Sequence, residues 1–136
     1  MSADFIDTNV LVYLASGDPA KADRAEAVLA GGGVISVQVL NELANVARRK
    51  MGLDWAGTRD LLDTIRALLE VRPLDLTTHD LGLSLAERHG LSVYDAMIVA
   101  AALEAGSETL WSEDMHDGLV VEGRLRIVDP FRTAAP

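Results

Sequence analysis

A short apolar stretch near the start of the chain is closed by three polar residues, and this combination restricts the folds that the sequence can adopt. Phe5 and Ile6 suit a short buried strand, and Asp7, Thr8 and Asn9 follow where that strand would end. These three residue types are common at helix starts. They would also lie where an open α/β sheet binds ligands, at the carboxyl end of a strand. On these residues alone both interpretations stay open.

The rest of the chain alternates short apolar stretches with helical segments. Helices are predicted to about residue 15 after Asn9, then over residues 20–29, 37–51, 55–70, 77–89 and 93–105, and further strands over 34–35, 73–76, 109–111 and 126–128. This alternation predicts a parallel sheet flanked by helices. Residues 1–131 are expected to form a single domain, and residues 132–136 a frayed tail.

Composition narrows the class of protein. The 136 residues are 49% hydrophobic and 24% charged, which is typical of a globular domain, and the absence of cysteine excludes disulfides and thiol chemistry. The longest apolar run, residues 96–103, is far shorter than the roughly 20 residues of a membrane-spanning helix. The amino terminus does not resemble a signal peptide. We therefore expect a cytoplasmic protein with no membrane contact.

Four acidic side chains are predicted to meet at one edge of the sheet. Each lies at or just beyond a strand end, or at a helix start; they are Asp7, Glu42, Asp95 and Asp114. Clustered carboxylates raise one another's pKa, and the two lysines of the chain lie outside these motifs. Oxygen-only ligands suit Mg²⁺ or Mn²⁺, and such a site suits phosphodiester hydrolysis. For Asp95 a second interpretation stays open, because Ser92 to Asp95 also matches a capping box.

Other chemistries find less support in the sequence. The triple glycine Gly31-Gly32-Gly33 precedes a strand and lacks the Gly-Lys-Ser/Thr of a phosphate-binding loop. A receiver-type signalling domain needs a lysine at the end of its last strand, and no lysine follows Lys50. A haloacid-dehalogenase-like phosphatase needs a second aspartate where this chain has Asn9. Of these two, the receiver domain remains the nearer alternative.

Four motifs of this chain together resemble those of PIN-domain ribonucleases, most closely the toxins of VapBC-type toxin–antitoxin pairs. The motifs are Phe5-Ile6-Asp7-Thr8-Asn9, Ser36-Val37-Gln38-Val39-Leu40-Asn41-Glu42, Tyr94-Asp95-Ala96-Met97-Ile98-Val99-Ala100-Ala101-Ala102 and Ser112-Glu113-Asp114-Met115-His116-Asp117-Gly118. The resemblance extends from Ala3 to about Phe131. It implies a three-layer α/β/α sandwich with a central parallel sheet and a metal-dependent endoribonuclease. A PIN-like domain that binds a partner without catalysis is the main alternative.

The resemblance also implies roles for particular residues. Asp7 and Asp95 would bind Mg²⁺ or Mn²⁺ most directly, and Glu42 and Asp114 would complete the metal site. Three further residues would orient or supplement them: Asn9, Ser112 and, as a variable acid, Asp117. Members of this family are commonly homodimers and bind a small antitoxin.

The charge of the chain limits how it can bind RNA. A net charge of −9 disfavours general affinity for nucleic acid, even after the clustered acids are set aside. We therefore expect local RNA contacts, through the metal and through the basic segment formed by Arg48, Arg49 and Lys50.

Overall fold

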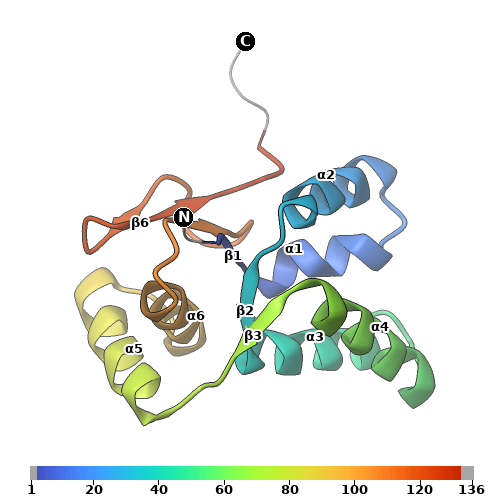
Figure 1. Ribbon diagram of the computed structural model, residues 1–136, viewed down its shortest axis with the longest axis horizontal. Coiled ribbons are helices and arrows are strands. Elements are labelled where there is room, and N and C mark those ends of the chain that lie inside the picture. Colours follow the sequence, from blue (N-terminus) through green and yellow to red (C-terminus); the bar gives the residue numbers. More distant parts are fainter. Residues whose placement is uncertain (1–2, 133–136) are drawn as a thin grey trace.

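A six-stranded sheet forms the centre of the computed structural model, which describes residues 3–132 (Figure 1). The strands are β1 (Phe5–Ile6), β2 (Val34–Ser36), β3 (Glu70–Arg72), β4 (Thr109–Trp111), β5 (Val120–Val121) and β6 (Leu125–Val128). Their order is β3-β2-β1-β4-β6-β5, and all neighbours are parallel except β5, which is antiparallel to β6. The predicted parallel sheet is thus confirmed, with one antiparallel strand at its edge.

Helices cover both faces of this sheet. They are α1 (Thr8–Val12), continued by the 3₁₀ turn η1 (Tyr13–Ala15), then α2 (Pro19–Ala30), α3 (Val37–Arg49), α4 (Trp55–Leu68), α5 (Leu76–His89) and α6 (Val93–Glu104). Figure 1 shows α5 and α6 on one face and α1 to α4 on the other. The expected three-layer α/β/α sandwich is therefore confirmed. Within residues 3–132, no helix is long and apolar enough to cross a membrane.

Helix α6 is the most deeply buried helix of the described chain. All its residues from Ala96 to Leu103 are buried, which explains its apolar sequence. It packs against α5 at Gly82, where a Cβ atom would stand 2.5 Å from the Sδ of Met97. The missing side chain at position 82 therefore sets how closely the two helices approach.

The region between α4 and α5 differs from the prediction. The strand predicted over 73–76 is wrong: β3 covers Glu70–Arg72, and α4 ends at Leu68 instead of near Glu70. Pro73 cannot donate a hydrogen bond to a neighbouring strand. Asp75 accepts a hydrogen bond from the backbone N–H of Thr78, so that α5 begins at Leu76.

The C-terminal part of the chain adds two smaller differences. The two-residue strand β5 was not predicted. The predicted tail, residues 132–136, lies outside the described residues except for Arg132, so its frayed state and the limits of the single domain stay predictions.

The connections reverse direction at the middle of the sheet. From β1 the chain builds β2 and β3 on one side, with α1 to α4 on one face, and then returns through α5 and α6 to place β4 on the other side of β1. The backbone N–H of Asp7 donates to the carbonyl of Trp111 at 2.9 Å, which joins the carboxyl ends of β1 and β4. In open α/β sheets this switch point is where ligands bind.

Candidate functional site

A cavity of about 460 Å³ lies at this switch point and collects the predicted acids. It is lined by Asp7, Thr8, Asn9, Val12, Tyr13, Glu42, Asn45, Val46, Lys50, Asp95, Glu113 and Asp114. The four predicted carboxylates therefore line one cavity, although they come from four separate segments of the chain.

Asp7 is the most buried of these carboxylates, with 4% of its surface exposed. It occupies the N-cap position of α1, where its Oδ1 accepts from the backbone N–H of Thr8 at 2.7 Å. Burial raises the pKa of Asp7 to about 7, and the charges of Glu42 and Asp95 add to the rise against the opposing hydrogen bonds. Asp7 thus caps a helix and also lines the cavity.

Asn9 and Ser112 hold the second oxygen of Asp7. The Ser112 hydroxyl donates to Asp7 Oδ2 at 2.8 Å, and the Asn9 amide donates to the same oxygen at 3.2 Å. Asn9 Oδ1 in turn accepts from the backbone N–H of Glu113 at 3.0 Å, which ties the segment after β4 to α1. The structure therefore brings both residues beside Asp7, as the resemblance implied.

Two residues orient Glu42, and no contact with Glu42 was predicted for either of them. The Thr8 hydroxyl donates to Glu42 Oε1 at 2.7 Å, and the Gln38 amide donates to Oε2 at 3.2 Å. Gln38 precedes Glu42 by four residues on α3, a spacing that places both on one face of the helix and could have indicated the contact.

Asp95 lies in one half of a capping box and also lines the acidic cavity. Its backbone N–H donates to the Ser92 hydroxyl at 3.2 Å, so Ser92 does cap α6. Its carboxylate nevertheless lines the acidic cavity, where burial raises its pKa, the Ser92 hydroxyl lowers it and the charge of Asp114 raises it further. The capping bond itself uses the backbone N–H of Asp95, and the carboxylate remains in the lining of the cavity.

Both lysines lie closer to the site than the sequence suggested. The expectation that they stand outside the acidic motifs is wrong for Lys21, whose ammonium donates to Glu113 Oε2 at 2.8 Å and to the Tyr13 hydroxyl at 3.0 Å. The Tyr13 hydroxyl donates to Glu113 Oε1 at 2.8 Å. Lys50 lines the cavity itself. The fold brings these groups together across long stretches of sequence, which local spacing does not reveal.

Three other selected residues lie outside the acidic cavity. The carboxylate of Asp117 accepts hydrogen bonds from the backbone N–H of Asp129 and from Arg132, both at 2.8 Å, so Asp117 supports the end of the domain.

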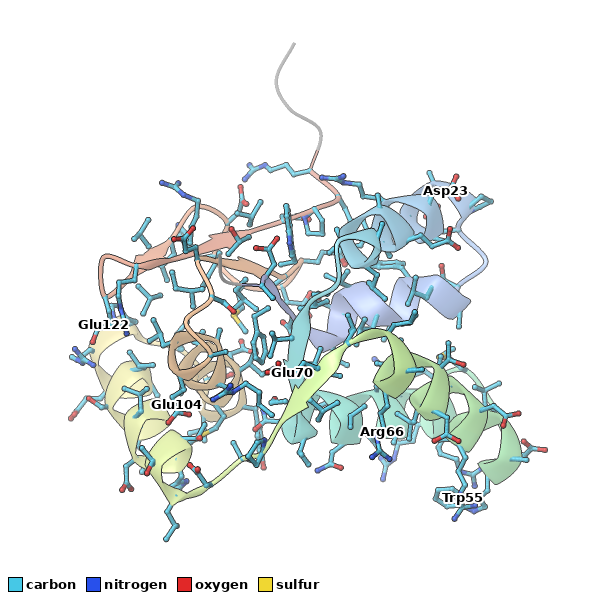
Figure 2. All side chains as sticks on the ribbon, in the orientation of Figure 1. Asp23, Trp55, Arg66, Glu70, Glu104 and Glu122 are labelled. Carbon is cyan, nitrogen blue, oxygen red and sulfur yellow. The ribbon has the colours of Figure 1, made fainter. Side chains whose placement is uncertain are left out.

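The two arginines, Arg48 and Arg49, lie beside the exposed ring of Trp55. Arg48 donates to the carbonyl of Leu53, and its Cζ lies 4.2 Å from the ring centroid of Trp55. Arg48 and Arg49 line a neighbouring groove with Ala44, Asn45 and Trp55. Figure 2 shows Trp55 at the outer edge of α4.

The donor chemistry of the cavity fits a hard divalent cation. Its lining acids offer carboxylate oxygens only, and the raised pKa of Asp7 reflects a buried negative charge that a cation would stabilise. Within residues 3–132, no three acidic or histidine side chains are close enough together to form a complete metal site as they stand. The carboxylates would therefore have to draw together around the ion.

Comparisons with known proteins place this geometry in a family. The model of the PIN domain matches residues 5–116, while no curated protein matches the sequence. A toxin-antitoxin complex from Klebsiella pneumoniae superposes with a TM-score of 0.75 at 19% identity, covering 96% of this chain and 100% of that chain.

Two further solved structures are also similar. VapC20 of Mycobacterium tuberculosis, described as a Sarcin-Ricin loop cleaving toxin, gives a TM-score of 0.69 at 20% identity and covers 82% of this chain and 90% of that chain. DNA-bound VapBC from Salmonella typhimurium gives 0.65 at 22% identity, covering 96% and 99%. At these identities the likeness establishes the fold, and the family-model match covers well over half of the sequence. The chain therefore belongs to the PIN-domain family.

Proposed function

We propose that this chain is a Mg²⁺- or Mn²⁺-dependent endoribonuclease and the toxin of a toxin–antitoxin pair. The observation that carries the proposal is the convergence of four carboxylates on one cavity at the switch point of a PIN-domain sheet. One structural neighbour is itself described as a toxin that cleaves the Sarcin-Ricin loop.

The residues of the cavity divide into ligands and supports. Asp7 and Asp95 would hold the cation directly, and Glu42 and Asp114 would complete the site. A divalent ion bound there supplies a Lewis acid for the phosphodiester and lowers the pKa of the attacking water. Ser112 and Asn9 fix the Asp7 carboxylate, and Thr8 fixes Glu42. These supports limit how far the Asp7 and Glu42 carboxylates can turn away from the substrate.

RNA would reach the cavity along the basic segment at the end of α3. Lys50 lines the acidic cavity, and Arg48 and Arg49 line the groove next to it, with Asn45 common to both. Phosphates bound along this segment would meet positive charge on an otherwise acidic protein. RNA contact by these three residues therefore remains part of the proposal.

A cleavage assay tests the activity. Single-stranded RNA is incubated with the protein in Mg²⁺, Mn²⁺ or EDTA, and cleavage is expected with either metal and not with EDTA. Asp7→Asn should abolish cleavage, because it removes a central carboxylate charge while leaving a side chain that can still cap α1. Asp117→Asn is the matched control, because Asp117 lies outside the cavity, and it should cleave normally. Absence of metal-dependent cleavage by wild type would instead favour a PIN-like binding domain without catalysis, and equal cleavage by wild type and Asp7→Asn would show that the cleavage does not come from this cavity.

The acidic cavity also suggests how a partner protein would inhibit the enzyme. We propose that a small antitoxin inserts an arginine among the carboxylates, because the guanidinium meets carboxylates bidentately and stays charged. Val12 of α1 and Val46 of α3 line the cavity and would add apolar contact. One structural neighbour is described as a toxin-antitoxin complex. We also propose that the chain forms a homodimer.

Co-expression with the neighbouring open reading frame tests the partner. A small protein should co-purify, and the complex should cleave RNA more slowly than the free chain. If nothing co-purifies, or if the complex cleaves as fast as the free chain, the toxin–antitoxin assignment fails while the nuclease assignment can still stand.

A further inference from the structure

A second groove opens beside the acidic cavity. Its volume is about 380 Å³, and it is lined by Gln38, Asn41, Glu42, Asn45, Leu74 and Tyr94. Glu42 and Asn45 line both this groove and the acidic cavity, so the two hollows adjoin each other. A strand of RNA whose phosphate lies at the carboxylates would therefore have a neighbouring nucleotide within reach of the second groove.

The groove offers amide and aromatic groups and no basic side chain. Asn41 and Asn45 lie four residues apart on one face of α3, and Glu42 lines the groove beside them. Both asparagines are exposed, and neither side chain has a hydrogen-bond partner among residues 3–132. Opposite them, Tyr94 is 70% exposed and Leu74 is 42% exposed. Unpaired amides beside an exposed ring can hydrogen-bond and stack at the same time.

The walls of this groove are held at a fixed separation. Gln38 is 7% exposed, and its amide donates both to Glu42 Oε2 at 3.2 Å and to the backbone carbonyl of Tyr94 at 2.8 Å. One buried side chain thus joins α3 to the first turn of α6. The ring of Tyr94 therefore extends from a backbone that is fixed relative to Asn41 and Asn45.

We propose that this groove binds one unpaired nucleobase of the RNA next to the cleaved phosphodiester. Tyr94 stacks on the base, and Asn41 and Asn45 form hydrogen bonds with its edge, as proteins that read single-stranded RNA do. A base fits the lining better than a phosphate does, because the only charged residue of the groove is Glu42. The proposal rests on the proposed function and adds a preference for single-stranded RNA with a particular base at this position.

Nuclear magnetic resonance gives a test that does not need catalysis. The four nucleoside 5′-monophosphates and ribose 5-phosphate are added separately to labelled protein in EDTA. At least one nucleotide should shift the side-chain amide signals of Asn41 and Asn45, and ribose 5-phosphate should not. The shift should be lost in Tyr94→Leu and kept in Tyr94→Phe, which retains the ring. Leu68→Ala, an exposed apolar change on α4 that lines none of these grooves, should keep the shift.

The affinity for a single-stranded oligoribonucleotide, measured in EDTA, gives the size of the contribution of Tyr94. Tyr94→Leu should weaken this binding by roughly 5- to 150-fold, the effect of losing one stacked base. Equal shifts with ribose 5-phosphate, no shift with any nucleotide, or unchanged RNA binding by Tyr94→Leu would overturn the proposal. A lower molecular mass of Tyr94→Leu than of wild type in light scattering, with no nucleotide-dependent shift in wild type, would also overturn it, because the groove would then be a protein contact.

The nuclease assay separates this proposal from the one on which it rests. Nucleotide-dependent shifts without RNA cleavage would leave the base site standing and remove the nuclease assignment. RNA cleavage by wild type, together with an unchanged KM in Tyr94→Leu, would leave the nuclease assignment standing and remove the base site.

Discussion

At the scale of single residues, Asp7 makes the stability of the metal-free protein depend on pH. Its folded-state pKa of about 7 lies above the ordinary value of 3.8, so the folded protein holds this proton more tightly than the unfolded chain. The contribution is fully present below about pH 4 and is lost as the pH rises through about 7. A shift of this size corresponds to at most about 4 kcal/mol.

Denaturation in EDTA between pH 4 and 8 checks this sign. Wild type should lose stability relative to Asp7→Asn as the pH rises, because the variant has no carboxyl proton to release. Asp117→Asn is the control, and its stability should follow that of wild type over this range because the pKa of Asp117 is lowered by its bonds to Asp129 and Arg132. If the stabilities of wild type and Asp7→Asn changed in parallel with pH, the pKa of the Asp7 carboxyl would not be raised in the folded protein.

Asp95 gives a second prediction at this scale. Asp95→Asn should keep or raise metal-free stability, because it removes a charge that raises the pKa of Asp7 and keeps the backbone bond to Ser92. RNA cleavage should be abolished. Ser92→Ala is the companion variant: it removes the cap and should cost about 1 kcal/mol. Thermal unfolding in EDTA and a parallel cleavage assay measure the two effects. A large loss of stability in Asp95→Asn, with cleavage retained, would show that the Asp95 side chain has a structural role alone.

At the scale of elements, β1, β2, β4 and β6 were predicted from local sequence, and β3 and β5 were not, although both residues of β5 are apolar. β1, β2 and β4 are short runs of apolar residues between turn signals, and the prediction found all three. β3 reads Glu70-Val71-Arg72, and its extended state depends on parallel pairing with β2, which sequence periodicity does not carry. The candidate site shows the same difference between what the local sequence indicates and what the packing of elements decides. Asp7 and Asp95 could be selected at a strand end and a helix start, whereas the Lys21–Glu113 pair depends on how the elements pack.

The contact between α5 and α6 gives a prediction for packing. Gly82→Val should lower the free energy of unfolding by about 1–3 kcal/mol, because the new side chain would overlap Met97 and force the helices apart. Ser84→Val is the matched control: it places the same β-branched residue at an exposed position of α5 and isolates its helix propensity. Urea denaturation measures both. Equal effects of the two substitutions would mean that the α5–α6 contact adjusts without cost.

At the scale of the whole molecule, the net charge disfavours RNA binding, whereas the local arrangement of basic residues favours it. A chain of net charge −9 repels RNA at long range, while the basic residues gathered at the end of α3 lie beside the acidic cavity. For the proposed RNA substrate, this arrangement would confine phosphate contacts to a few residues. Affinity should therefore come from local contacts at the cavity and less from the general electrostatic attraction that basic nucleic-acid-binding proteins use.

The dependence of RNA binding on salt measures how many phosphate contacts the protein makes. With Arg48, Arg49 and Lys50 as the phosphate ligands, the slope of log K against log salt in EDTA should be no steeper than about −2, since each contact on a single strand contributes about −0.7. Arg49→Gln should make the slope shallower by about 0.7. Arg66→Gln removes an exposed arginine from α4 that lines none of these grooves, and it should leave the slope unchanged (Figure 2). A wild-type slope far steeper than −2, or equal effects of the two substitutions, would place the RNA on another surface of the molecule.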